Sequence, residues 1–199
     1  SAPGSPHRAP PREYHAGHRD AVSAREDTGC VVESYGRRVV VEHSGGERSP
    51  CKLKRKNLDL VAGDEVNLRL APGDDEWTVT ERRPRRNVLC RSDSRGRSES
   101  LAANLDQLGV VVAPRPACDP FVVDRYIAGA RYAGIDALLI VNKLDLPSEA
   151  GDLSFVDPFR ALGMPVIPVS AHSGAGLQAL IERLSGRRSL LAGQSGVGK

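Results

Sequence analysis

Residues 190–199 read LLAGQSGVGK, and the last seven of them spell G-x-x-x-x-G-K. The apolar run predicts a buried strand, and the glycines let the following turn point several backbone amides at one spot. Such a turn binds phosphate oxygens, and Lys199 would add a cation for the β- and γ-phosphates. Taken alone, an ordinary glycine-rich turn is the alternative. The predicted phosphate loop (P-loop) comprises Gly193, Gln194, Ser195, Gly196, Val197, Gly198 and Lys199.

A second motif, NKLD, directly follows the apolar run DALLIV. Asn142, Lys143 and Asp145 are therefore expected where a buried strand ends, at the edge where open α/β sheets bind ligands. An ionised Asp145 can accept hydrogen bonds from N1–H and the exocyclic amine of guanine, a donor pair that adenine lacks. Asn142 would join neighbouring loops, and the stem of Lys143 would cover the base. As an alternative, Asp145 caps a following short helix.

A third apolar run, PVIPV, ends in SAHSGAG. The backbone amide of Ala171 is expected to reach guanine O6, with Ser170 supporting the turn. Alternatively, Ser170 caps the next helix. The chance that N-K-x-D and G-x-x-x-x-G-K occur together by accident is on the order of one in a thousand. The sequence therefore predicts a guanine nucleotide site.

Strands and helices alternate over residues 101–199. Buried strands are predicted at 107–113, 136–141, 165–169 and 189–192. Helices are predicted at 119–134, where Asp119 and Pro120 form the start, at 157–162 and at 175–186. This alternation favours a parallel sheet with helices on its faces.

The chain ahead of this region has a different pattern. Residues 29–90 contain short β-runs separated by turn residues, which predicts a small barrel, with the OB-fold favoured and an SH3-like barrel as the alternative. Residues 91–100, RSDSRGRSES, contain no apolar residue, which predicts a flexible basic linker or loop. Residues 1–28 have no hydrophobic periodicity and few large aliphatic residues, and they are predicted to be a disordered tail.

Composition narrows the function classes. No run of 18 apolar residues is present, so no membrane span is predicted. The four cysteines form no C-x-x-C pair, so no metal site is predicted in this chain. The net charge of +3 falls within residues 28–100, which favours a polyanionic partner. The basic residues considered for that contact, with a solvated surface as the alternative, are Lys52, Lys54, Arg55 and Lys56. Of two barrel aromatics that could stack on bases, Tyr35 and Trp77, the second is expected in the core.

The guanine-reading loops precede the P-loop here, whereas the usual GTPase order places the P-loop first. The chain thus resembles a circularly permuted GTPase. An OB-like barrel containing VAGDEV (61–66) and ending in RRNVLCR (85–91) precedes AANLDQLGVVVA, DRYIAGARYAGIDALLIVNKLDL and LLAGQSGVGK. These stretches are similar to the bacterial ribosome small-subunit-dependent GTPase A family, and the resemblance covers roughly residues 29–199.

The resemblance implies an all-β OB-fold barrel, then an α/β circularly permuted P-loop GTPase domain, then a zinc domain absent from this chain. It implies GTP or GDP with Mg²⁺, one zinc in the missing domain, GTP hydrolysis stimulated by the 30S subunit, and barrel contacts with 16S rRNA. A cytoplasmic monomer without membrane contact, acting in late 30S maturation, is expected.

Hydrolysis requires groups that residues 1–199 do not supply. The Ser or Thr that would follow Lys199 as a Mg²⁺ ligand, the switch segments and a D-x-x-G loop are all missing. We therefore expect the first part of a longer protein or a truncated product, inactive alone, with its catalytic residue unassigned. The alternative function is a non-catalytic rRNA-binding OB module with an incomplete nucleotide site.

Overall fold

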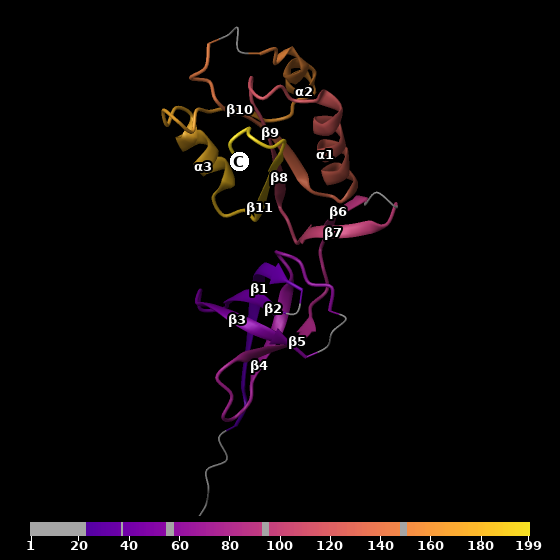
Figure 1. The fold of residues 1–199 in the computed structure, drawn as a ribbon, viewed down its shortest axis with the longest axis vertical. Coiled ribbons are helices and arrows are strands. Elements are labelled where there is room, and N and C mark those ends of the chain that lie inside the picture. Colours follow the sequence, from indigo (N-terminus) through magenta and orange to yellow (C-terminus); the bar gives the residue numbers. More distant parts are fainter. Residues whose placement is uncertain (1–22, 37, 55–57, 93–95, 148–150) are drawn as a thin grey trace, which may run out of the picture.

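Strands with alternating buried and exposed residues close into a barrel in the first half of the chain (Figure 1). The computed structural model describes residues 23–36, 38–54, 58–92, 96–147 and 151–199. The barrel strands are β1 (Arg25–Tyr35), β2 (Arg38–His43), β3 (Arg48–Leu53), β4 (Glu65–Leu70) and β5 (Trp77–Arg82). They pair in the order β1-β2-β3-β5-β4, and β4 pairs with β1 to complete the ring. The predicted small β-barrel is confirmed.

Side chains alternate across a strand, and in β2 and β4 alternate residues are buried. The buried residues of this core are Val31, Val39, Val41, Cys51, Leu60, Val66, Leu68 and Val79. Trp77 is partly buried and packs against the same cluster, as expected from the sequence. The barrel therefore has a hydrophobic core separate from that of the second region.

Two predicted boundaries were wrong. Strand β1 begins at Arg25, within the tail expected at 1–28, because residues 25–28 pair with β4 through their backbone rather than through apolar side chains. The linker expected at 91–100 contains arms of an antiparallel hairpin, β6 (Val88–Ser92) and β7 (Ser98–Ala103). Polar cross-strand contacts such as Arg91 Nε to Glu99, 2.8 Å, replace apolar burial there. Residues 1–22 and 93–95 lie outside the described residues.

The second half of the chain contains a parallel sheet in the order β10-β9-β8-β11. Its strands are β8 (Gln107–Val112), β9 (Asp136–Val141), β10 (Val166–Pro168) and β11 (Ser189–Gly193). Every residue of β8 is buried, which is the pattern of a strand covered on both faces. The predicted α/β domain is confirmed, and we call residues 104–199 the G region.

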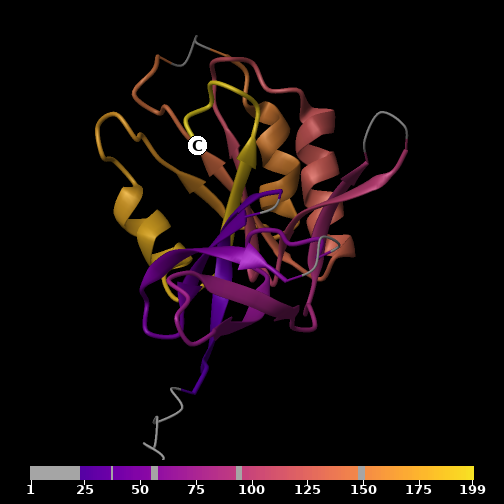
Figure 2. The ribbon, with the colours of Figure 1, turned by 60° about the horizontal axis from the view of Figure 1, so that its bottom comes forward.

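Helices cover both faces of this sheet (Figures 1 and 2). One face packs against α1 (Pro120–Tyr132) and the segment holding α2 (Asp157–Ala161), while the other packs against α3 (Leu177–Leu184). As predicted, Asp119 caps α1 by accepting a hydrogen bond from the Phe121 amide at 2.9 Å. Among the described residues, no helix is both long enough and apolar enough to cross a membrane.

Candidate guanine nucleotide site

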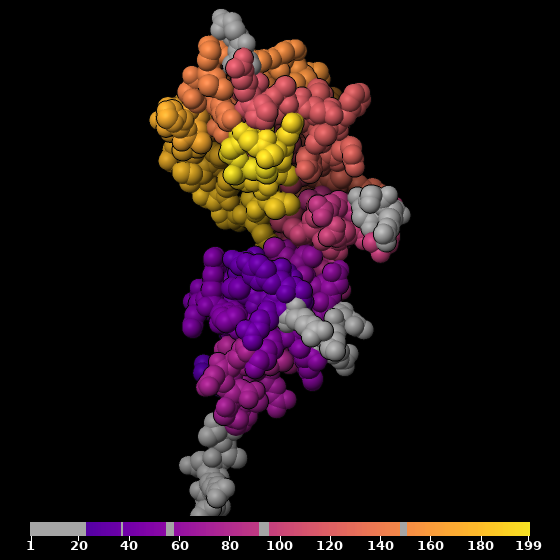
Figure 3. Space-filling model, viewed as in Figure 1, coloured from indigo at the N-terminus to yellow at the C-terminus, as the bar shows by residue number. Residues whose placement is uncertain are grey.

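The three predicted loops converge at the carboxyl edge of the parallel sheet. Residues 142–145 follow β9, residues 170–171 follow β10, and the P-loop follows β11. Parallel strands end on the same side, so loops far apart in the sequence meet there. Figure 3 shows the end of the chain, in yellow, at the surface of the G region.

Asn142 joins two of these loops. Its side chain is buried, and Nδ2 donates to the carbonyl oxygens of Val197 at 2.9 Å and Gly198 at 3.3 Å. Its Oδ1 accepts a hydrogen bond from the Ala171 amide at 3.0 Å. A Cβ atom at position 198 would lie 2.5 Å from Asn142 Nδ2, so glycine is required for this contact. Asn142 thus holds the P-loop against the loop that follows β10.

The Ala171 amide has a partner within the protein that the sequence did not predict. The sequence predicts that the Ala171 amide reaches guanine O6, but in the structure this amide donates to Asn142 Oδ1. The reason is tertiary, because burial of Asn142 places its amide oxygen directly at this turn. This hydrogen bond braces the site, and a contact between the Ala171 amide and guanine O6 stays a prediction.

Lys143 forms a second link to the P-loop. Its backbone has a positive φ of 65°, and its Nζ donates to the carbonyl oxygens of Gly196 at 2.7 Å and Arg115 at 2.8 Å. The ammonium therefore joins the P-loop to the loop that follows β8. Sequence reasoning missed Arg115, although its position just beyond a buried strand was a signal. The stacking of the Lys143 stem on a base stays a prediction.

Asp145 presents an exposed carboxylate supported by Ser170. The Ser170 hydroxyl donates to Asp145 Oδ1 at 2.5 Å and accepts from the Ser173 amide at 3.1 Å. The hydrogen bond from Ser170 is the main reason that the pKa of Asp145 is lowered from its usual range. The carboxylate is therefore ionised at neutral pH, the state needed to accept from guanine N–H groups.

Neither helix-capping alternative is seen among the described residues. Asp145 lies in a turn, and the next described helical residues are Ser154–Val156, preceded by Leu153 at the capping position. The capping position of α3 is occupied by Gly176 rather than Ser170.

The P-loop has one buried residue, Val197, and the residues on both sides of it are exposed. Val197 is fully buried against the sheet face that includes Val111 and Ile140. Gly196 and Gly198 both have a φ of 85°, a backbone conformation that favours glycine. Lys199 is exposed, with Nζ 3.3 Å from the Gln194 carbonyl oxygen. The buried Val197, two glycines with positive φ and the long cationic side chain of Lys199 together suit the binding of a phosphate group.

The structure describes only two of the four basic barrel residues considered for polyanion binding, Lys52 and Lys54. Lys52 forms an ion pair with Glu76 at 3.0 Å, whereas Arg55 and Lys56 lie outside the described residues. Lys54 lines an open surface hollow of about 620 Å³ on the barrel. Tyr35 is exposed, but its hydroxyl contacts Glu33. Of the two basic residues that the structure describes here, one is therefore paired with an acid and one lies at an open surface, and their contact with a polyanion stays a prediction.

Comparisons with known proteins agree with the motif order. The family model described as RsgA GTPase matches residues 82–199. A protein named Small ribosomal subunit biogenesis GTPase RsgA from Pseudomonas aeruginosa (strain UCBPP-PA14) is 41% identical over 177 residues, which cover 87% of this chain and 52% of that protein. The protein of the same name from Azotobacter vinelandii is 40% identical over 181 residues, with the same coverage of both chains. The chain spans about half the length of the curated relatives it matches.

Two solved structures have the same arrangement. YjeQ from Thermotoga maritima has a TM-score of 0.66 and 29% identity, and the match covers 88% of this chain and 63% of that one. YloQ, described as a circularly permuted GTPase, has a TM-score of 0.64 and 22% identity, with coverage of 94% and 64%. The likeness to YloQ is evidence for the fold alone.

Proposed function

This chain belongs to the RsgA GTPase family, and on that premise we propose that it is the barrel and guanine-nucleotide-binding portion of a GTPase that acts in small ribosomal subunit biogenesis. The observation that carries the proposal is the hydrogen bonding of Asn142 to both the P-loop and Ala171, which gathers three loops into one site. The names of the curated relatives support the same role.

Each residue of the site has a distinct part in this proposal. The ionised Asp145 accepts from guanine N1–H and the exocyclic amine, and Ser170 holds it in place. Asn142 and Ala171 brace the loops, and Lys143 restrains Gly196. The backbone amides and glycines of residues 193–199 receive the phosphates, with Lys199 as their cation. Mg²⁺, when bound with GTP, would neutralise the phosphate oxygens and assist hydrolysis.

The proposed partner is the small ribosomal subunit, and 16S rRNA is the surface that the barrel would contact. The positive net charge of the chain, +3, supports binding to a polyanion. A protein with this role would work in the cytoplasm, and we propose that it does so as a monomer with GTP turnover stimulated by 30S subunits.

Base selectivity tests the proposal most directly. We expect Asp145→Asn to weaken GDP binding on the order of 10- to 100-fold and to improve binding of xanthosine diphosphate, because xanthine presents a carbonyl where guanine presents an amine. The measurement is a titration of both labelled nucleotides into the wild type and the variant, with Mg²⁺ present.

Asp152→Asn is the matched control, since Asp152 is another carboxylate bonded to a serine, Ser154, but lies outside the site. It should leave both affinities unchanged. If Asp145→Asn kept the preference for guanine, the assignment would fail. A wild-type chain that binds 30S subunits but no nucleotide would instead support the non-catalytic RNA-binding module.

A further inference from the structure

A loop of the barrel is fastened to the beginning of the G region. The Ala103 amide donates to the Ala62 carbonyl oxygen at 2.9 Å, and Asn104 Nδ2 donates to the Gly63 carbonyl oxygen at 2.9 Å. A Cβ atom on Gly63, which has a φ of 91°, would overlap the Ala103 carbonyl oxygen. Close backbone approach therefore fixes residues 61–64, here called the barrel loop, against residues 102–104.

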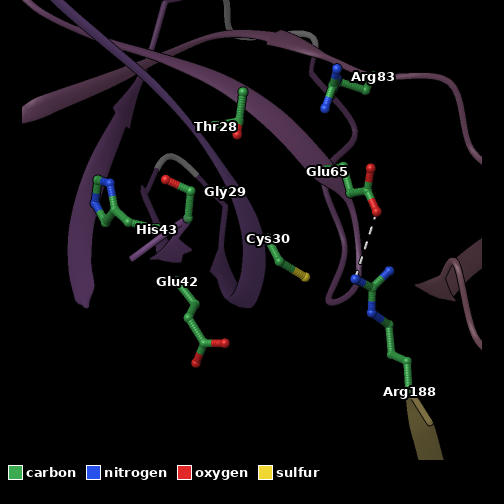
Figure 4. A pocket seen from close by; sticks show the side chains of 9 residues that line it. Thr28, Gly29, Cys30, Glu42, His43, Glu65, Arg83 and Arg188 are labelled. Carbon is green, nitrogen blue, oxygen red and sulfur yellow. Dashed lines mark ion pairs between the residues drawn. The ribbon is translucent and has the colours of Figure 1, made fainter. Parts of the chain in front are cut away.

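Arg188 reaches the same barrel loop from a distant part of the sequence. Its Nη1 donates to the carbonyl oxygens of Gly63 at 3.3 Å and Asn104 at 3.2 Å, and its Nη2 lies 3.7 Å from Glu65 Oε1 (Figure 4). The Arg188 backbone is also fixed, because its amide donates to Asp106 Oδ2 at 2.7 Å. One residue thus contacts the barrel through its side chain, and the G region through both its side chain and its backbone.

The position of Arg188 matters because β11 begins at the next residue. Strand β11 pairs in parallel with β8, from Ser189 opposite Gln107 to Gly193 opposite Val111, and then continues into the P-loop. Hydrogen-bonded strands move as stiff units, so a shift at the start of β11 reaches Gly193. In the described part of the sheet, β11 pairs with β8 alone, so its alignment depends on that pairing and on how the residue before it is held.

The surroundings of the Arg188 side chain allow such a shift. An open hollow of about 210 Å³ lies beside it, lined among others by Cys30, Glu42 and Arg83 (Figure 4). The guanidinium is partly exposed and its ion pair with Glu65 is long. The Arg188 side chain therefore has several contacts that hold it against the barrel loop, and open space beside it if that loop moves.

We propose that Arg188 is a positioning residue that aligns β11, and through it the P-loop, with the barrel loop. A ligand that displaces the barrel loop then changes nucleotide affinity, and bound nucleotide changes affinity for that ligand by the same factor. The nucleotide end of this coupling rests on the proposed function, whereas the mechanical link from Arg188 to β11 does not.

Amide hydrogen exchange tests the mechanical link in the full 199-residue chain without nucleotide. We expect Arg188→Ala to speed exchange of residues 189–199 about five-fold or more, the equivalent of one lost hydrogen bond, while β2 and β9 keep their protection. Arg188→Lys should have an intermediate effect, because lysine keeps the charge without the planar fork.

Arg187→Ala is the matched control. Arg187 also precedes β11, but its Nη1 contacts Gln107 and Asp136 within the G region. It should change exchange of residues 189–199 less than two-fold. Unchanged exchange in Arg188→Ala, an equal effect of Arg187→Ala, or a loss of protection across the whole chain in both Arg188 variants would each overturn the proposal.

The coupling itself is measured with labelled GDP and 30S subunits as the probe. Saturating 30S subunits should shift the GDP dissociation constant at least three-fold in the wild type and in Arg187→Ala, and less than 1.5-fold in Arg188→Ala. An equal shift in all three proteins would contradict coupling through Arg188. Absence of GDP binding in the wild type would contradict the proposed function, while the exchange result would still decide the mechanical link.

Discussion

The barrel and the G region differ in how their strands are paired at the edges of each sheet. In the barrel, β1 pairs with both β2 and β4, so the ring closes on itself. In the G region the parallel sheet is open, and its described part ends at β10 and β11. A closed barrel pairs all of its strands around the ring, whereas the parallel sheet gathers the carboxyl ends of its strands at one edge, where ligands bind.

The two regions also differ in how they hold polar groups. In the barrel, the buried His43 at the end of β2 has ring nitrogens that contact Asp27 at 2.9 Å and Ser49 at 2.7 Å. In the G region the buried amide of Asn142 connects loops at the candidate site. Buried polar side chains with hydrogen-bond partners therefore link strands within the barrel and link loops at the candidate site.

The largest expected effect lies where the regions meet. Asp64 is fully buried, and its carboxylate accepts from Arg85 Nε at 2.7 Å and Nη2 at 2.9 Å. Asp64→Ala would leave the mostly buried Arg85 guanidinium without its main partner, and we expect a loss of about 3–5 kcal/mol in the free energy of unfolding. Chemical denaturation measures this.

The exposed carboxylate of Asp75 supplies the control, since Asp75→Ala should change stability by about 0.5 kcal/mol or less. If Asp64→Ala proved equally mild, the pair would not be what joins the barrel loop to Arg85.

A pair of core substitutions tests whether the two regions unfold together. Leu68 in the barrel and Leu139 in the sheet are both buried, and we expect Leu→Ala at either position to cost about 2–5 kcal/mol. If the junction couples the regions, each variant should keep one transition when followed by tryptophan fluorescence from Trp77 and by far-ultraviolet circular dichroism.

Separate transitions, with only the mutated region destabilised, would show that the two cores are independent. Leu162→Ala provides the matched control, because this leucine is 78% exposed and should be nearly neutral.

The smallest expected effect is a pH dependence at the junction. Hydrogen bonds from the Arg188 amide and then from Arg86 lower the pKa of Asp106 from its usual range. Because the folded pKa lies below the unfolded one, this stabilisation is full above pH of about 4 and is lost as pH falls through the folded pKa. Asp106→Asn should therefore cost about 1 kcal/mol or less at pH 6 and still less at pH 3.

Unfolding of the wild type and the variant across this pH range measures the difference. Asp136→Asn, which removes an exposed partner of Arg187, is the control. A difference that grew toward pH 3 would have the wrong sign for this assignment.

Much of the fold could be predicted because its signals are local. Apolar runs at 107–113 and 136–141 indicate buried parallel strands, and Asp119 with Pro120 marks the start of α1. The polar part of the hairpin, at 91–92 and 98–100, escaped prediction because it forms through backbone pairing, which polar sequences can also make. The early start of β1 has the same explanation.

The sequence by itself determined the order of the motifs, the type of each region and the residues gathered at the candidate site, because spacing and side-chain chemistry are properties of short segments. Only the tertiary structure decided that the Ala171 amide serves Asn142, that Lys143 holds Gly196, and that Arg188 contacts the barrel. Those contacts join residues up to 125 positions apart, and their partners are set by packing rather than by local sequence.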